Sequence, residues 1–117
     1  ETNLPLNYYE LVVTGDLGMH GKNLCLQLLE ENGITIKDFY DDCGVMIYDT
    51  QKQKTDCGGS GCACSATVLC GYILDKLSKR ELNRVLFVGT GALHSPISVQ
   101  QGESIPAIAH AVGIEMI

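Results

Sequence analysis

Long apolar runs and clustered positive charge are both missing from this chain. No stretch of about eighteen consecutive apolar residues occurs, so no part of the sequence is expected to cross a membrane. The N-terminus shows no signal-peptide pattern. The 117 residues include 8 Lys or Arg against 14 Asp or Glu, which gives a net charge of -6. Because nucleic-acid-binding domains usually carry clustered basic residues, the composition argues against a nucleic-acid partner.

Familiar metal-binding patterns are also missing. The spacing Cys57-x4-Cys62-x-Cys64-x5-Cys70 matches no common zinc motif, and no His lies near it in sequence. The acidic segment that ends with Asp42 lacks the fixed ligand series of an EF-hand, so we expect a solvated acidic loop at Asp38, Asp41 and Asp42. The sequence therefore predicts no metal site.

The six cysteines suggest buried thiols rather than a disulfide framework. Most of them fall inside helical patterns of a chain that is 45% hydrophobic, unlike the loop-rich sequences of small secreted proteins. We expect reduced thiols that pack as small apolar groups. The positions are Cys25, Cys43, Cys57, Cys62, Cys64 and Cys70.

What the chain does contain is a glycine-rich stretch, Gly58-Gly59-Ser60-Gly61, that leads directly into a helical pattern. Glycine reaches backbone angles that cost other residues energy. The helix that begins near Gly61 or Cys62 presents unpaired N–H groups and the positive end of its dipole. Such a loop can hold an anion, or it can let helix and sheet approach closely. Both interpretations remain open from the residues alone.

Apolar patterning along the chain predicts four strands and two helices in the order β-α-β-α-β-β. Asp16 is expected to cap the first helix and Gly33 to end it. Helical crossovers make the first three strands parallel, and a loop connection lets the last two run antiparallel. The predicted strands are 9–14, 43–48, 84–88 and 105–117, and the predicted helices are 17–32 and 62–79.

The last predicted strand has one bulky face and one small face. We expect the small face to contact a neighbouring helix, and we expect His110 on the bulky face to be a hydrogen-bonded core residue. Four strands and two helices cannot bury all the apolar residues of this chain, so we expect another part of a protein to cover much of its hydrophobic surface. The bulky face consists of Ile108, His110, Val112, Ile114 and Met116, and the small face of Ala107, Ala109, Ala111 and Gly113.

Two long runs carry a resemblance to a known family. GGSGCACSATVLCGYILDKL at 58–77, followed by RVLFVGTGALHSPISVQQGESIPAIAHAV at 84–112, resembles the C-terminal part of the stage V sporulation protein AD family of spore-forming Firmicutes. VVTGDLGMHGKNL and DDCGVMIYD extend the resemblance to nearly the whole chain. That family resembles thiolases and ketoacyl synthases, whose two similar halves form a layered α-β-α-β-α sandwich.

The resemblance implies an α/β fold, namely the C-terminal half of a thiolase-like domain, with a mixed sheet packed by helices. Residues 1–117 are then a single fragment of that domain without the opening strand and helix of the half. The start at Glu1 rather than Met agrees with this expectation.

The resemblance to condensing enzymes also allows a check of their chemistry. Those enzymes place a catalytic His after the strand that matches 11–14, where this chain has Gly15-Asp16-Leu17-Gly18. They place an Asn in the loop that opens the next helix, where this chain has Gly59. Such side chains stabilise an oxyanion, and glycine has no side chain to do so. The nucleophilic Cys belongs to the first half and matches none of the cysteines here. We therefore expect no catalytic residues and no enzymatic activity.

The resemblance implies a protein that binds dipicolinic acid (pyridine-2,6-dicarboxylic acid), free or as its calcium chelate, during uptake into the developing spore. Helix N-termini suit a dicarboxylate, whereas Asp16 would repel the free dianion and could help to hold the chelate. The turn 89–92 matches the glycine-rich turn near the cleft of the superfamily. The candidate ligand-binding residues are Gly15, Asp16, Gly58, Gly59, Ser60, Gly89, Gly91 and His94.

Further expectations follow from the same resemblance. It implies no cofactor, a homodimer, contact with the N-terminal half of its own fold, and association with other stage V A sporulation proteins. The expected location is peripheral, at the forespore or spore inner membrane, and otherwise on the cytoplasmic side. Two alternatives remain: a structural scaffold subunit of a spore membrane complex, and an acyl-thioester condensing enzyme of the thiolase or ketoacyl-synthase type.

Overall fold

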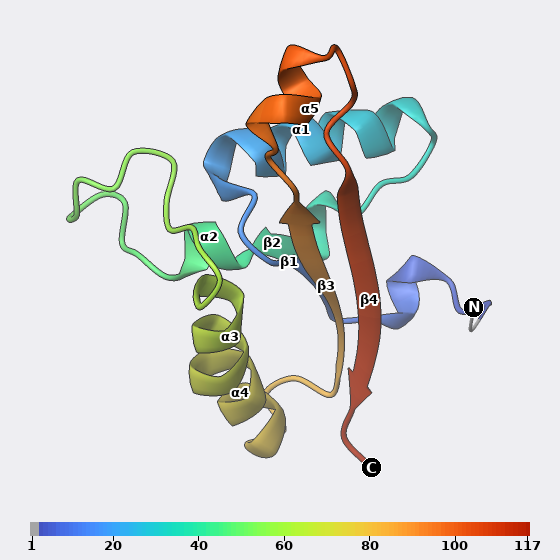
Figure 1. Cartoon of the computed structure of the whole chain (residues 1–117). Coiled ribbons are helices and arrows are strands. Elements are labelled where there is room, and N and C mark those ends of the chain that lie inside the picture. The colour runs from blue at the N-terminus through green and yellow to red at the C-terminus, as the bar shows by residue number, and fades with distance from the viewer. Residues whose placement is uncertain (1–2) are drawn as a thin grey trace.

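A four-stranded sheet in the order β2-β1-β3-β4 organises the computed structural model, which describes residues 3–117 (Figure 1). β1 pairs in parallel with both β2 and β3, and β4 pairs antiparallel with β3. The predicted α/β class, the mixed sheet and the strand directions are confirmed. The strands are β1 (Leu11–Thr14), β2 (Tyr40–Asp42), β3 (Arg84–Ala92) and β4 (Ala107–Glu115).

Helices cover the two faces of the sheet. On one face lies α1 (Gly18–Glu31), which connects β1 to β2. On the other lies a helical segment made of α3 (Cys64–Val68), a π-helical turn (η3, Leu69–Ile73) and α4 (Leu74–Ser78). Short helices complete the described chain: η1 (Leu6–Tyr8), η2 (Lys37–Phe39), α2 (Cys43–Met46) and α5 (Pro96–Gln100).

Each face has its own apolar core. Tyr9, Val12, Ile36 and Tyr40 form the core beneath α1, with Leu26 and Leu29 of the helix packed against it. The core beneath α3 and α4 is formed by Val13, Cys43, Cys64, Val68, Ile73, Leu77 and Val85. Val12 and Val13 point to opposite faces because side chains alternate along a strand. The apolar run of β1 is thus buried on both sides, as expected for a parallel strand between two layers.

The second strand differs from its prediction. The sequence predicted a strand at 43–48, but β2 ends at Asp42 and residues Cys43–Met46 form α2. The Asp42 side chain accepts a hydrogen bond from Gly44 N at 3.0 Å and so caps this short helix. An apolar run of this length is compatible with a strand or with a buried helix. The hydrogen bond from Gly44 N to Asp42 stabilises the helix. The loop connection predicted between the last two strands likewise contains α5, capped by Ser95.

The last strand was predicted to carry a core histidine and to contact a helix through its small-residue face, and both predictions are wrong. β4 is an edge strand, and all its residues except Ile114 are exposed. His110 is therefore a surface residue, not a core histidine. The small-residue face from Ala107 to Gly113 is exposed, and the Tyr9 hydroxyl lies close to Gly113. The helices cover the centre of the sheet and leave this edge open (Figure 1).

The cysteines divide between the core and the surface. Cys43 and Cys64 are buried, as predicted, whereas Cys57, Cys62 and Cys70 are exposed. The prediction of packed thiols is thus wrong for these three. Two of them lie at the glycine-rich loop, which runs along the surface before the helix begins at Cys64 rather than near Gly61.

Candidate functional site

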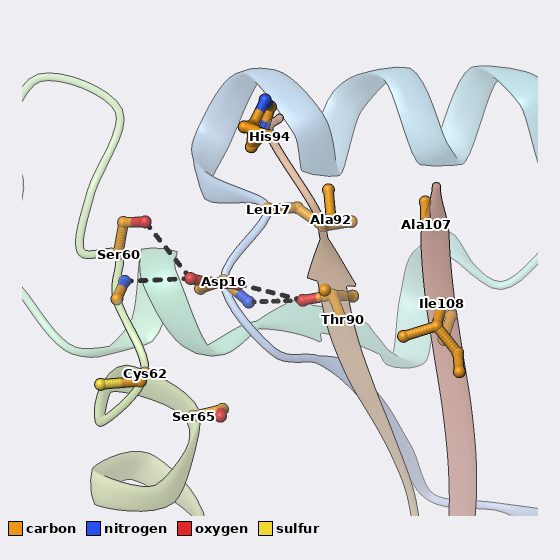
Figure 2. A pocket seen from close by; sticks show the side chains of 13 residues that line it. Asp16, Leu17, Ser60, Cys62, Ser65, Thr90, Ala92, His94, Ala107 and Ile108 are labelled. Atoms are coloured by element: carbon orange, nitrogen blue, oxygen red, sulfur yellow. Dashed lines mark hydrogen bonds between the residues drawn. The ribbon is translucent and has the colours of Figure 1, made fainter. Parts of the chain in front are cut away.

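A cavity of about 900 Å³ opens at the carboxyl end of β1. Its walls come from the turn after β1, the glycine-rich loop before α3, the end of β3 and the start of β4 (Figure 2). Ligands of open α/β sheets commonly bind outside the carboxyl ends of the strands. The lining residues are Asp16, Leu17, Ser60, Gly61, Cys62, Ser65, Thr90, Gly91, Ala92, His94, Ala107, Ile108 and Ala109.

Asp16 connects two of these walls (Figure 2). One carboxylate oxygen accepts the Thr90 hydroxyl at 3.0 Å, and the Thr90 oxygen in turn accepts Asp16 N at 3.2 Å. The other carboxylate oxygen accepts the Ser60 hydroxyl at 3.2 Å and Gly61 N at 3.0 Å. Hydrogen bonds to a carboxylate are stronger than those between neutral groups. Asp16 therefore holds the glycine-rich loop against β3.

The wall opposite the glycine-rich loop is formed by small and apolar side chains. Ala92 and Ala107 lie on neighbouring strands, next to Ile108 (Figure 2). His94 stands beyond them in the loop after β3. The cavity thus combines an apolar wall with hydroxyl, imidazole and carboxylate groups, a combination typical of small-molecule sites.

Four of the eight predicted ligand-binding residues line this cavity, namely Asp16, Ser60, Gly91 and His94. The structure does not bring Gly15, Gly58, Gly59 or Gly89 to its surface. A Cβ on Gly15 would lie 2.7 Å from Thr90 Oγ1, so that glycine permits a close approach of β1 and β3. Gly89 lies within β3, and His110 of β4 is its nearest neighbour.

The glycine-rich loop packs against a helix through two of its glycines and turns a third toward Asp16. Gly58 has φ +113°, and a Cβ there would collide with the Gly44 carbonyl. Gly59 N donates to that same carbonyl at 2.6 Å, so both residues pack the loop against α2. Gly61, with φ +107° and no atom near its Cβ position, turns its N–H toward Asp16. Only glycine adopts such φ values without strain.

Asp16 does not cap α1, because Asp42 occupies that role. The Asp42 carboxylate accepts Leu17 N at 2.9 Å, Gly18 N at 2.9 Å and the Thr14 hydroxyl at 2.6 Å, in addition to Gly44 N. One buried side chain thus caps the N-termini of both α1 and α2. The prediction of a solvated acidic loop is wrong for Asp42, which has no exposed surface. Asp41 lies in β2, keeps 36% of its side chain exposed and pairs with Lys22 at 2.8 Å.

A buried hydrogen-bonded chain surrounds Asp42. The Thr14 hydroxyl has a single hydrogen, which it donates to Asp42, so at 2.9 Å the Tyr40 hydroxyl donates to Thr14. Burial raises the pKa of the Tyr40 phenol above its ordinary range. Burial, assisted by the Asp42 carboxylate, also raises the pKa of the Cys43 thiol to about 12. Thr14, Asp42 and Cys43 are buried, so this junction between β2, α1 and α2 is closed to solvent.

Sequence reasoning missed Thr90, Ser65 and the role of Asp42. Thr90 reaches Asp16 only because β3 is in register with β1, a pairing that follows from the fold. Ser65 lines the cavity from the first turn of α3. For Asp42 a signal was present, because Asp two residues before Gly44 is a common capping pattern.

Residues 3–117 contain neither a cluster of metal ligands nor a membrane-spanning helix. Within this range, no three His, Cys, Asp or Glu side chains gather closely enough to hold a metal ion. Over the same residues, no helix is both long and apolar enough to span a membrane.

Comparison with known proteins identifies the family. Residues 1–115 match the stage V sporulation protein AD (SpoVAD) family. The chain is 45% identical over 115 residues to the stage V sporulation protein AD of Bacillus subtilis (strain 168). That alignment covers 98% of this chain and 34% of the relative, so the chain spans about a third of the length of the curated relative that it matches. The chain belongs to the stage V sporulation protein AD family.

Proposed function

We propose that this chain contributes a binding site for dipicolinic acid, in its calcium-chelated form, to a protein that acts in the uptake of this compound into the developing spore. The observation that carries the proposal is the cavity around Asp16, where the glycine-rich loop meets the ends of β3 and β4. Membership of a sporulation family supplies the biological setting.

The chemistry of the cavity suits a planar aromatic dicarboxylate. A pyridine ring needs a flat apolar surface, which Ala92, Ala107 and Ile108 offer. Its carboxylates need hydrogen-bond donors, and the hydroxyl of Ser65 and the imidazole of His94 lie on the same cavity. Small-molecule sites range from about 300 to 1,000 Å³. The volume of about 900 Å³ admits the compound together with its ion and water.

Asp16 determines which form of the ligand fits. A carboxylate at the edge of the cavity repels a free dianion, but it attracts a calcium ion that the dianion already chelates. Calcium takes six to eight oxygen ligands, more than one dipicolinate provides. Asp16 would supply one of the remaining oxygens, with water and the Ser60 hydroxyl nearby. The ion is then part of the cargo rather than a resident cofactor.

We further propose that the protein is not an enzyme. The turn after β1 carries Asp16 rather than a His, and Gly59, at the position of the superfamily Asn, packs against Ile47 and Tyr48. Neither position offers a group to polarise a thioester carbonyl. The resemblance to thiolases then concerns the fold alone, with residues 1–117 as the C-terminal part of a thiolase-like domain.

The proposal includes partners and a location. The N-terminal half of the same domain would cover apolar surface that this chain leaves exposed, such as Leu24 and Leu28 of α1. Other stage V A sporulation proteins would hold the protein peripherally at the forespore or spore inner membrane.

A calorimetric titration of the full-length protein with dipicolinate, with and without calcium, tests the proposal. We expect saturable binding that requires calcium and both carboxylates, with pyridine-2-carboxylate as the control ligand. Ser65→Ala should weaken binding roughly tenfold, the value of one hydrogen bond to a charged group. Ser78→Ala, in an exposed turn of α4, is the matched control and should leave binding unchanged. Heat equal to that of dilution in every condition would refute a dipicolinate site.

A further inference from the structure

Thr90 and the glycine-rich loop hold Asp16 from two sides (Figure 2). We propose that Thr90 is a positioning residue, which fixes the Asp16 carboxylate so that one oxygen, Oδ1, remains free to bind the ion of the chelate. This role rests on the function proposed for the cavity. It adds the residue that orients the carboxylate and the oxygen atom that meets the ion.

Thr90 contacts both the backbone and the side chain of Asp16. Its oxygen accepts Asp16 N at 3.2 Å, and its hydroxyl donates to Asp16 Oδ1 at 3.0 Å. A hydroxyl has a single hydrogen, so the hydrogen that Thr90 gives to Asp16 is not available to a ligand in the cavity. The two bonds close a small ring that includes the Asp16 side chain and restricts its rotation. Thr90 is therefore placed to orient Asp16 rather than to donate to a ligand itself.

Gly15 provides the space that the Thr90 hydroxyl needs for this contact. A Cβ on Gly15 would lie 2.7 Å from Thr90 Oγ1 and 3.1 Å from Thr90 N. Rotation of a side chain cannot relieve the second contact, because that nitrogen belongs to the backbone of β3. Gly15 does not have a positive φ, so the site uses its missing side chain rather than an unusual backbone angle. Gly15, Asp16 and Thr90 thus form one packed unit.

The hydrogen bonds of Asp16 leave one acceptor position free. A carboxylate has about four such positions, about two on each oxygen. Oδ2 uses both of its positions, for the Ser60 hydroxyl and for Gly61 N. Oδ1 uses one for Thr90, and no other bond within residues 3–117 reaches its second position. The buried Asp42 differs, because four hydrogen bonds fill all of its positions.

The free position predicts how Asp16 meets the ligand. Calcium accepts carboxylates through one oxygen or through two, and Asp16 can offer one without losing any of the bonds that hold the glycine-rich loop. Asp16 lines the cavity, so this oxygen is within reach of an ion bound there. Removal of the Thr90 hydroxyl should let the carboxylate rotate and so weaken the binding of the chelate.

A double-mutant cycle on the full-length protein tests whether Thr90 acts through Asp16. Thr90→Val keeps the shape of the side chain and removes its hydroxyl. In calorimetry with calcium dipicolinate, Thr90→Val should weaken binding about fivefold, the value of one hydrogen bond of ordinary strength. Thr90→Ser keeps the hydroxyl and should bind within about twofold of the unmodified protein. In the Asp16→Ala background, Thr90→Val should change binding by less than about twofold, because the group that Thr90 positions is gone.

Two results of this cycle would overturn the proposal. An equal loss from Thr90→Val in both backgrounds would mean that Thr90 does not act through Asp16. Binding by Thr90→Ser as weak as that by Thr90→Val would mean that the hydroxyl is not the group that matters. Thr67→Val is the matched control, since it removes an exposed hydroxyl of α3 that donates to Ala63 O, and it should leave binding unchanged.

A measurement without ligand separates this proposal from the proposed function. Gly61 N donates to Asp16 Oδ2, on the side of the carboxylate away from Thr90. Because a bond to a carboxylate moves an amide proton downfield, the Gly61 proton should move upfield in NMR spectra of Thr90→Val and stay in place in Thr90→Ser and Thr67→Val. An unmoved Gly61 proton in Thr90→Val would refute the positioning of Asp16, whether or not the cavity binds dipicolinate. The expected shift without any dipicolinate binding would instead refute the proposed ligand and support the positioning of Asp16.

Discussion

Two aspartates lie at the carboxyl ends of neighbouring parallel strands, and they differ in what surrounds them. Asp42 ends β2 and accepts four hydrogen bonds from Thr14, Leu17, Gly18 and Gly44 in a site without solvent. Asp16 follows β1 and accepts three, from Thr90, Ser60 and Gly61, at the wall of an open cavity. The same side chain thus joins loops at both places, but only one of the two is accessible to a ligand.

The comparison shows that hydrogen-bond partners alone do not distinguish a structural carboxylate from a binding one. Both carboxylates accept backbone N–H groups and hydroxyls, and both connect segments far apart in sequence. Burial makes the difference, because a buried carboxylate with all its acceptor positions filled has no capacity left. Asp16 keeps part of its surface open, so it can hold the glycine-rich loop and still meet a cation.

The largest effect is expected from replacing Asp42. Asp42→Asn keeps the volume but removes the charge and one of the two acceptor oxygens, so two buried N–H groups lose their partner. We expect a loss of about 4 kcal/mol in the free energy of unfolding, measured by urea denaturation. Asp16→Asn is the matched comparison and should cost about 1 kcal/mol, since water can replace its partners. Equal losses would remove the distinction between the two sites.

A smaller effect on the free energy of unfolding, opposite in sign at two glycines, distinguishes a closely packed glycine from an unpacked one. Gly58→Ala must move the Gly44 carbonyl and adopt a positive φ, so we expect a loss of about 2 kcal/mol. Gly71 lies in the π-helical turn with nothing near its Cβ position. Gly71→Ala should therefore gain about 0.5 kcal/mol in thermal or urea unfolding. A tolerated Gly58→Ala would show that the loop does not pack against α2 as described.

The smallest perturbation compares the alkylation rates of two thiols, Cys43 and Cys62, in the unmodified protein. Cys43 adjoins the buried junction, where burial raises its pKa to about 12, so alkylation at pH 8 should require unfolding. Cys62 lines the cavity and should react in the native state, together with the exposed Cys57 and Cys70. Calcium and dipicolinate should slow the reaction of Cys62 more than that of Cys70, as mass spectrometry of the alkylated peptides would show. Equal slowing of both thiols would place the ligand elsewhere.

The sequence predicted much of the fold because local patterns determined it. The apolar run of β1, the helical periodicity of 62–79 and the loop connection between the last strands were sufficient for the order and direction of the elements. The prediction of the second strand was wrong because an apolar run of six residues is compatible with a strand and with a buried helix. That choice depends on a hydrogen bond from Gly44 to Asp42, and the carboxylate is held in place by groups from β1 and α1. Only the assembled structure contains these contacts.

The candidate site was predictable only where local sequence patterns determine it. The glycines next to Asp16 and Ser60 indicate loops suited to a ligand, and the structure places the side chains of Asp16 and Ser60 in contact. The sequence does not show that Gly58 and Gly59 are used in packing, because their neighbour Gly44 comes from a different element. Thr90 was missed because its approach to Asp16 depends on the register between β1 and β3.

The most direct test of the distinction between the two aspartates is a titration of the isotope-labelled protein with calcium and dipicolinate, followed residue by residue by amide NMR. We predict that the largest shifts occur at Asp16, Ser60, Gly61, Thr90 and His94, and that the amides of Gly18 and Gly44, which are bonded to Asp42, shift least among their neighbours. Shifts centred on the Asp42 junction, or no shifts at saturating ligand, would contradict the assignment of the cavity at Asp16 as the binding site.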